Sequence, residues 1–117
     1  MKISILLPYK ENFSPIYAGA VSLFVKDTTK LSKFKKLITV YGNTNLKNIY
    51  NLSYKNIFLK KNLIESGSKL YVNKFLKFEE ENPSDIIEIH NRPNYFHLIN
   101  KKKQNQKLNN TIRNINI

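Results

Sequence analysis

ISILLPY, at residues 3–9, sets the architecture of this chain. The run is almost entirely apolar, and the polar residues Lys10, Glu11 and Asn12 follow it. A strand with one solvated face alternates polar and apolar residues, whereas a short unbroken apolar run is typical of a strand buried on both faces. Such strands lie inside parallel sheets that carry helices on both sides. Residues 3–9 therefore predict a central strand of a parallel sheet.

The segment that follows predicts a strand–helix–strand unit. After a loop that contains Pro15, apolar residues recur at helical spacing from Val21 to Leu31. Residues 37–41 are rich in β-branched side chains and are stopped by Gly42, which indicates a second strand.

The second half of the chain continues the alternation. An apolar stretch at 57–59 predicts a third strand, and Ser66 or Ser68 is a candidate cap for a second helix. Residues 85–89 predict a fourth strand, and residues 94–102 predict the start of a third helix. Alternating strands and helices imply right-handed crossovers and a parallel sheet. We expect an α/β, Rossmann-like doubly wound fold with strand order 3-2-1-4.

We expect two regions, an incomplete Rossmann-like domain at residues 1–100 and a tail at residues 101–117. The tail contains four lysines, one arginine and no acidic residue. It shows almost no apolar pattern before Ile112. We therefore predict a basic, poorly ordered tail of the kind that a truncation or a frame shift leaves.

Composition favours one cytoplasmic globular domain. The chain has 117 residues, of which 41% are hydrophobic and 24% charged, as is usual for globular proteins. The N-terminal apolar run is shorter than the roughly 7–15 residues of a signal peptide core, and nothing approaches the ~18–20 apolar residues of a membrane span. Cysteine is absent and there are two histidines, which excludes thiolate and histidine-rich metal sites. We expect neither a metal nor a cofactor.

The formal net charge of +12 permits two interpretations. Abundant lysine, asparagine and isoleucine indicate A/T-rich codon usage, which raises the charge without any functional demand. A basic surface also suits phosphate-bearing partners or the anionic inner face of a membrane.

The loop at residues 8–20 is the first candidate binding segment, because ligands of doubly wound sheets bind beyond the carboxyl ends of the strands. Gly19 lies where this loop enters the first helix, and free amides at a helix N-terminus attract phosphate. A glycine here also serves simple helix geometry. Neither a GxGxxG nor a P-loop sequence occurs, which counts against dinucleotide-binding and P-loop proteins.

The end of the fourth strand is the second candidate. Strand alternation places Glu88 and His90 on one side, opposite Ile89. A carboxylate and an imidazole at a buried strand end cost desolvation energy unless they are paired or used. Asn91 and Arg92 follow directly, and the arginine fork suits phosphate or carboxylate. Mutual pairing of Glu88 and His90 is the structural alternative to a binding site.

These segments also carry a family resemblance. SDIIEIHNRP, at residues 84–93, resembles the Asp-apolar-apolar-x-x-His segment of family 4 glycosyltransferases of the GT-B fold. Residues 3–9 and 17–22 are similar to the first strand and glycine-bearing loop of that family. The resemblance covers about residues 1–100 and is strongest to bacterial enzymes that build cell-surface polysaccharides.

The resemblance implies roles for individual residues. Gly19 would lie near the donor diphosphate, and His90 would reach the donor sugar from the acceptor-side domain. Glu11 would face acceptor or donor, and Glu88, Asn91 and Arg92 would belong to the substrate-binding loop. Two positions depart from the family pattern. Ala18 stands where many members have a first glycine, and Glu88 where many have histidine.

The resemblance further implies half of a two-domain enzyme. Family members transfer a sugar from a nucleotide-sugar donor to a glycan or lipid-linked acceptor, and their second domain supplies most nucleotide contacts. No such domain is encoded in these 117 residues. Because catalysis needs donor and acceptor held together, we expect no transfer by the chain alone.

Two other classes of protein remain as alternatives. A small basic nucleic-acid-binding protein would explain the charge and the aromatic residues, although no nucleic-acid motif occurs and no specific nucleic acid is expected. A non-catalytic α/β module that binds a small anion would share the fold.

Overall fold

The computed structural model describes residues 1–60, 66–106 and 110–116 and contains a five-stranded parallel sheet between helices. Its elements, in chain order, are β1 (Ile3–Leu6), α1 (Ala20–Leu31), the 3-10 turn η1 (Lys35–Leu37), β2 (Ile38–Gly42), β3 (Tyr54–Asn56), α2 (Gly67–Glu81), β4 (Ile86–His90), α3 (Pro93–Gln106) and β5 (Thr111–Ile115). The strand order is β3-β2-β1-β4-β5, so the expected doubly wound α/β fold is confirmed.

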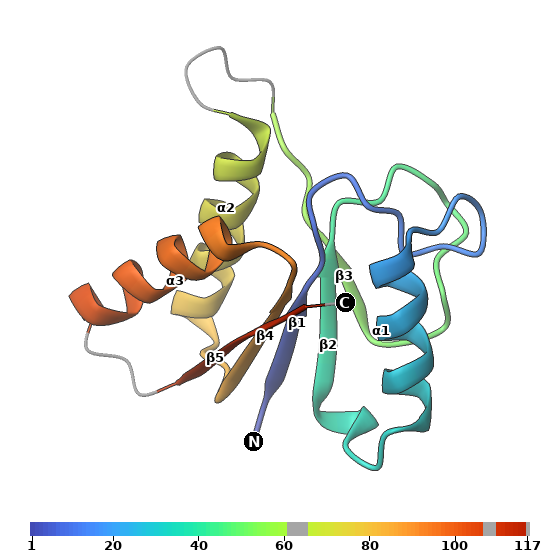
Figure 1. Cartoon of the computed structure of the whole chain (residues 1–117), viewed down its shortest axis with the longest axis horizontal. Coiled ribbons are helices and arrows are strands. Elements are labelled where there is room, and N and C mark those ends of the chain that lie inside the picture. The colour runs from blue at the N-terminus through green and yellow to red at the C-terminus, as the bar shows by residue number, and fades with distance from the viewer. Residues whose placement is uncertain (61–65, 107–109, 117) are drawn as a thin grey trace.

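The sheet separates two apolar clusters, because successive strand residues point to opposite faces. Helix α1 lies on one side of the sheet, and α2 and α3 lie on the other (Figure 1). Ile3, Ile5 and Leu7 contact the α1 side, whereas Leu6, Ile87 and Ile89 belong to the cluster of α2 and α3. Strand β1 therefore buries both of its faces, as its unbroken apolar sequence predicts, whereas Ile86 and Glu88 of β4 are only partly buried.

Helix α2 begins where the sequence indicates. The Ser66 side chain accepts a hydrogen bond from the Lys69 amide at 3.2 Å, which caps the helix. Tyr71, Val72 and Phe75 form its buried stripe. The Tyr71 hydroxyl donates a 2.6 Å hydrogen bond to the Leu7 carbonyl and so ties the helix to the end of β1.

The third strand lies three residues before its predicted position. Tyr54–Asn56 pairs with β2, whereas Ile57, predicted to be in the strand, follows it as a fully buried residue. β3 is an edge strand, so backbone pairing rather than apolar content determines its limits. The apolar run at 57–59 marks the point at which the chain leaves the sheet.

The prediction of a poorly ordered tail from residue 101 is wrong where the structure describes it. Helix α3 continues to Gln106, and Thr111–Ile115 forms β5 parallel to β4. Tyr95 and Ile99 anchor the helix, so its polar final turns need no apolar pattern of their own. In β5, Ile112 packs against the cluster of α2 and α3. An edge strand needs few apolar residues, so the sequence of β5 contains no apolar pattern that predicts a strand.

Candidate functional site

The reversal of strand order between β1 and β4 defines the candidate site. The chain leaves β1 toward α1 on one face and leaves β4 toward α3 on the other, so the loops diverge at the carboxyl edge of the sheet (Figure 1). Such a point is where doubly wound sheets bind ligands. Lys10, Tyr17 and Asn91 all have left-handed backbones, with φ of 67°, 55° and 53°. Strained positions of this kind cluster at functional sites.

His90 is the last residue of β4 and lies at this edge. Only 1% of its surface is accessible, and neither imidazole nitrogen has a hydrogen-bond partner among the described residues. The Phe24 ring of α1 covers it edge-on at a centroid distance of 5.9 Å. Burial lowers the pKa of His90, so the imidazole is neutral near pH 7. An unpaired buried imidazole costs free energy that a ligand can recover.

Glu88 lies on the same side of β4 as His90, as strand alternation predicts. Its Oε2 is 4.0 Å from His90 Nε2, which is too long for a hydrogen bond. Its other oxygen is 3.7 Å from the Arg113 guanidinium of β5. Glu88 therefore lies between Arg113 of β5 and His90, slightly closer to the arginine. Arg113 belongs to the segment predicted to be poorly ordered, so no sequence signal connected it with Glu88.

Asn91 and Arg92 form the turn into α3, and β5 holds this turn in place. The Asn91 amide donates to the Ile115 carbonyl at 3.0 Å, and the Arg92 amide donates to Asn114 Oδ1 at 3.3 Å. The Arg92 guanidinium donates to the Asn91 carbonyl at 2.8 Å. The Arg92 guanidinium, which was predicted to bind an anion, thus bonds to the backbone of its own turn. The side chain must turn outward before it can contact an anion.

Glu11 occupies the N-terminus of α1. Its Oε2 accepts hydrogen bonds from the Ser22 amide at 2.6 Å and the Ser22 hydroxyl at 2.8 Å. A Cβ atom on Gly19 would lie 2.5 Å from the other Glu11 oxygen, so the glycine admits the carboxylate. The helix N-terminus predicted to attract phosphate already holds an anion from the chain itself. A donor phosphate at Gly19 would have to displace Glu11.

A cavity of about 450 Å³ opens at the same edge, beside the ends of β2 and β3. Asparagines dominate its lining, together with Lys10 and Thr44: Asn12, Asn43, Asn45 and Asn56. Thr44 and Asn56 bind each other, since the Thr44 amide donates to Asn56 Oδ1 at 2.7 Å. The sequence analysis predicted no binding role for this segment. Its repeated asparagines directly after a strand were the available signal.

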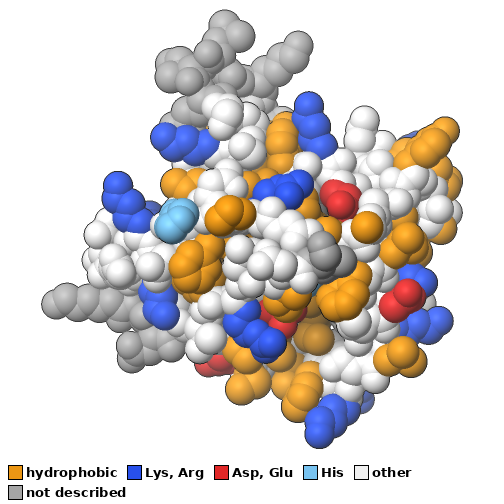
Figure 2. Space-filling model, viewed as in Figure 1, with side chains coloured by type: hydrophobic (Ala, Val, Ile, Leu, Met, Phe, Trp, Pro, Cys, Tyr) orange, Lys and Arg blue, Asp and Glu red, His pale blue; other side chains and the backbone are white. Residues whose placement is uncertain are grey.

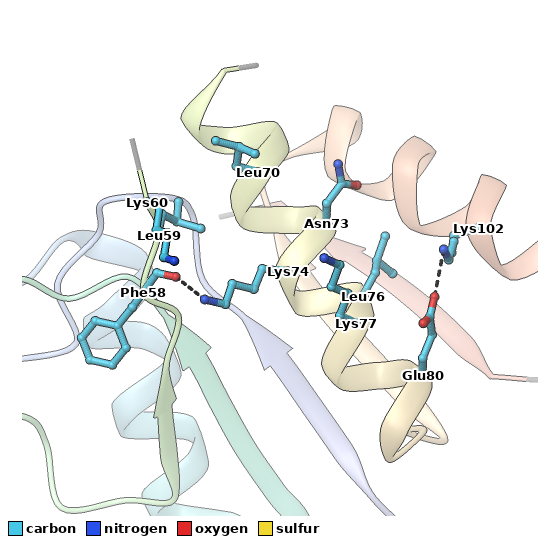
Figure 3. A pocket seen from close by; sticks show the side chains of 10 residues that line it. All are labelled: Phe58, Leu59, Lys60, Leu70, Asn73, Lys74, Leu76, Lys77, Glu80 and Lys102. Carbon is cyan, nitrogen blue, oxygen red and sulfur yellow. Dashed lines mark hydrogen bonds and ion pairs between the residues drawn. The ribbon is translucent and has the colours of Figure 1, made fainter. Parts of the chain in front are cut away.

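Another cavity lies between α2 and the segment after β3 (Figure 3). It measures about 820 Å³, and Lys60, Lys74, Lys77 and Lys102 line it. Two of these lysines are engaged: Lys74 donates to the Phe58 carbonyl at 2.6 Å, and Lys102 lies 2.9 Å from Glu80. The Glu80 pKa is lowered by its hydrogen bonds from Lys102 and Gln106. This groove shares Phe58 and Leu59 with the cavity beside β2 and β3 and extends from there along α2.

Comparison with protein-family models, with curated proteins and with solved structures gives no significant match. Within the described residues, no group of three or more histidine, cysteine or acidic side chains is placed to hold a metal ion. None of the described helices has the length and apolar character needed to cross a membrane.

Proposed function

We propose that this chain is the acceptor-side domain of a glycosyltransferase that uses a nucleotide-sugar donor. The observation that carries the proposal is His90, a buried imidazole without a hydrogen-bond partner among the described residues, at the carboxyl end of β4 beside the β1 loop. The similarity of residues 84–93 to family 4 glycosyltransferases supports the same assignment. In this role the chain forms one wall of a cleft, and a separate nucleotide-binding domain forms the other.

A neutral imidazole suits the hydroxyl groups of a sugar better than it suits a phosphate. It offers one N–H donor and one nitrogen acceptor, and it adds no charge. The lowered pKa of His90 keeps it in this form at neutral pH. Since Phe24 lies over the ring and is itself 39% exposed, we propose that this side chain swings away when the sugar enters.

The asparagine-lined cavity supplies a place for the acceptor. Amide side chains donate and accept hydrogen bonds without charge, which matches the hydroxyls of a glycan. Lys10, which also lines this cavity, belongs to the strained loop after β1. We place the enzyme in the cytoplasm, where its basic surface would favour acceptors held at an anionic membrane face.

Calorimetric titration with nucleotide sugars tests the proposal. UDP-glucose and GDP-mannose serve as probes, and wild type is compared with His90→Gln and with the matched control His97→Gln, whose imidazole lies exposed on α3. We expect saturable binding of at least one probe that weakens in the His90 variant and not in the control. Equal binding by both variants, or no saturation with any probe, would contradict the assignment.

Nucleic-acid binding is the second candidate, because four lysines line the groove on α2 (Figure 3). Binding through phosphates falls steeply with salt, whereas sugar recognition by amides and a neutral imidazole does not. Random single-stranded oligonucleotides are therefore titrated at 50 and 200 mM salt. Strong, steeply salt-dependent binding that Lys60→Gln/Lys77→Gln removes would favour this candidate over the transferase.

A further inference from the structure

The sheet is unevenly covered on the α1 side. Parallel sheets are normally buried on both faces by helices. α2 and α3 cover one face, whereas α1 covers the other face near β1 and β2 (Figure 1). At the amino-terminal end of the sheet, Ile86 and Glu88 of β4 and Arg113 of β5 line an open hollow. No helix in the described part of the chain fills it.

The hollow measures about 340 Å³, and its walls are mainly apolar. Met1 and Phe34 at its rim are 76% and 48% exposed. The principal apolar residues are Met1, Ile3, Ile5, Phe34, Ile38 and Ile86. We call this surface the β1–β4 hollow. Exposed apolar surface of this kind, beside a sheet that lacks its cover, indicates an interaction site.

The dimensions of the uncovered surface fit one α-helix. It extends across β1, β4 and β5, which pair in register from Ile3 to Ile86 and from Ile86 to Thr111. Neighbouring strands are about 4.8 Å apart, so three strands span roughly 10 Å. An α-helix with its side chains has a diameter of about 10 Å. Helices also cover the other parts of this sheet.

The charge around the hollow indicates the chemistry of that helix. The turn from α1 to β2 carries exposed lysines at positions 30, 33, 35 and 36, and no acidic residue occurs between Asp27 and Glu65. Lys33 Nζ lies 5.3 Å from the centre of the Phe34 ring at the rim. The acid in the hollow, Glu88, is opposed by Arg113. Figure 2 shows hydrophobic side chains beside Lys and Arg side chains in the lower middle of that view.

We propose that the β1–β4 hollow binds an amphipathic helix with an apolar stripe and acidic flanks, contributed by another polypeptide. The apolar stripe covers Met1, Phe34 and Ile86, which are exposed or partly exposed, above the buried Ile3 and Ile5. The acidic flanks meet Arg113 and the lysines of the turn from α1 to β2. A second copy of this chain fits poorly, because two chains of net charge +12 repel each other. This inference does not depend on the transferase assignment, since the hollow lies toward the amino-terminal end of β1 and β4 and shares only Glu88 with the candidate site.

A peptide panel tests the inference on the full chain. The probe is an 18-residue helix with leucines at helical spacing and glutamates on its flanks. Its controls are a scrambled peptide of equal composition and a peptide with lysine in place of glutamate. Binding is followed by fluorescence anisotropy, and the contact residues are mapped by amide NMR shifts. We expect the acidic helix alone to saturate and to shift the amides of β1, β4 and β5.

Charge-reversal variants locate the contact. Lys33→Glu/Lys36→Glu should raise the Kd of the acidic helix by about tenfold or more, as expected for reversal of two charges in the turn that carries Phe34. The matched control Lys47→Glu/Lys69→Glu makes the same change in net charge at exposed positions outside the turn from α1 to β2, and it should change the Kd far less. Both variants alter exposed side chains, so circular dichroism should show unchanged folding.

Four results would overturn the inference. Three of them are no saturation by the acidic helix, equal binding of the scrambled or basic peptide, and NMR shifts confined to residues that neither line the hollow nor belong to the turn from α1 to β2. The fourth is occupation of the hollow by something else. Concentration-dependent dimerisation in sedimentation that Lys33→Glu/Lys36→Glu alters would assign it to a second copy, and capture by anionic phosphatidylserine vesicles in place of the peptide would assign it to a membrane.

Discussion

The His90 imidazole links the stability of the fold to pH. Burial lowers its folded-state pKa below the usual value of about 6.5. As pH falls through 6.5, the unfolded chain takes up the proton before the folded chain does, so the free energy of unfolding decreases. Above that pH the imidazole is neutral in both the folded and the unfolded chain, so it no longer lowers the free energy of unfolding.

We therefore expect wild type to lose stability between pH 7.5 and 5 more steeply than His90→Gln, by at most about 1.4 kcal/mol per pH unit. Urea unfolding at each pH measures this difference. The control His97→Gln removes an exposed imidazole and shows the effect of losing a histidine that is not buried. Parallel curves for wild type and His90→Gln would show that the imidazole is not desolvated.

Gly19 and Glu11 act as a pair. A methyl group on Gly19 would displace the Glu11 carboxylate from the start of α1, and loss of a helix cap costs about 1 kcal/mol. Gly19 has φ of −78°, which alanine also adopts. We expect Gly19→Ala to destabilise wild type by about 1 kcal/mol, but to be neutral or stabilising by about 0.4–1 kcal/mol in a Glu11→Ala background. Additive losses in the double variant would refute the coupling.

At the scale of elements, the Tyr71 hydroxyl joins α2 to the end of β1. It donates to the Leu7 carbonyl at 2.6 Å, and burial raises its pKa well above the usual value, so it stays a donor. Tyr71→Phe leaves that buried carbonyl without its partner and should cost about 1–3 kcal/mol in chemical unfolding. Tyr17→Phe, at a position 86% exposed, is the control and should cost almost nothing. Equal stability of both variants would contradict the model of this junction.

Elements with strong local signals were predictable from the sequence, and edge elements were not. The apolar run identified β1, and Ser66 identified the start of α2. A strand buried on both faces needs consecutive apolar residues, and a helix cap needs a polar side chain such as serine. β3 and β5 depend on backbone pairing with a neighbouring strand, which needs little apolar sequence. β5 was missed for that reason, and with it the ion pair between Glu88 and Arg113.

At the scale of the whole molecule, the position of the candidate site was predictable but its internal contacts were not. Parallel topology places the ends of β1 and β4 together, so His90 lies at the predicted edge. The capping of α1 by Glu11 depends on a loop conformation in which Lys10 and Tyr17 are left-handed, and no spacing rule specifies such a loop. The cavity lined by asparagines likewise forms only where separate loops come together, and the sequence does not indicate that they do.

The whole molecule also determines what the chain can catalyse. In the transferase that we propose, this chain is one wall of a cleft, and one wall alone cannot hold donor and acceptor together or stabilise the charge that develops on a leaving diphosphate. We expect the purified chain to transfer no labelled sugar from UDP-glucose or GDP-mannose to glycan or lipid acceptors above the rate without protein. Scintillation counting of separated products measures this. A labelled product that depends on His90 would show that a second domain is unnecessary.

NMR of the two histidine side chains tests the central claim most directly. With ¹⁵N-labelled histidine, the ring nitrogens of His90 and His97 are observed separately while a nucleotide sugar is added. We predict a saturable shift of the His90 nitrogens as they gain a hydrogen-bond partner, with His97 unchanged as the internal reference. If the His90 nitrogens stay fixed at saturating ligand, or only His97 responds, His90 is a structural residue and the transferase site is not at the end of β4.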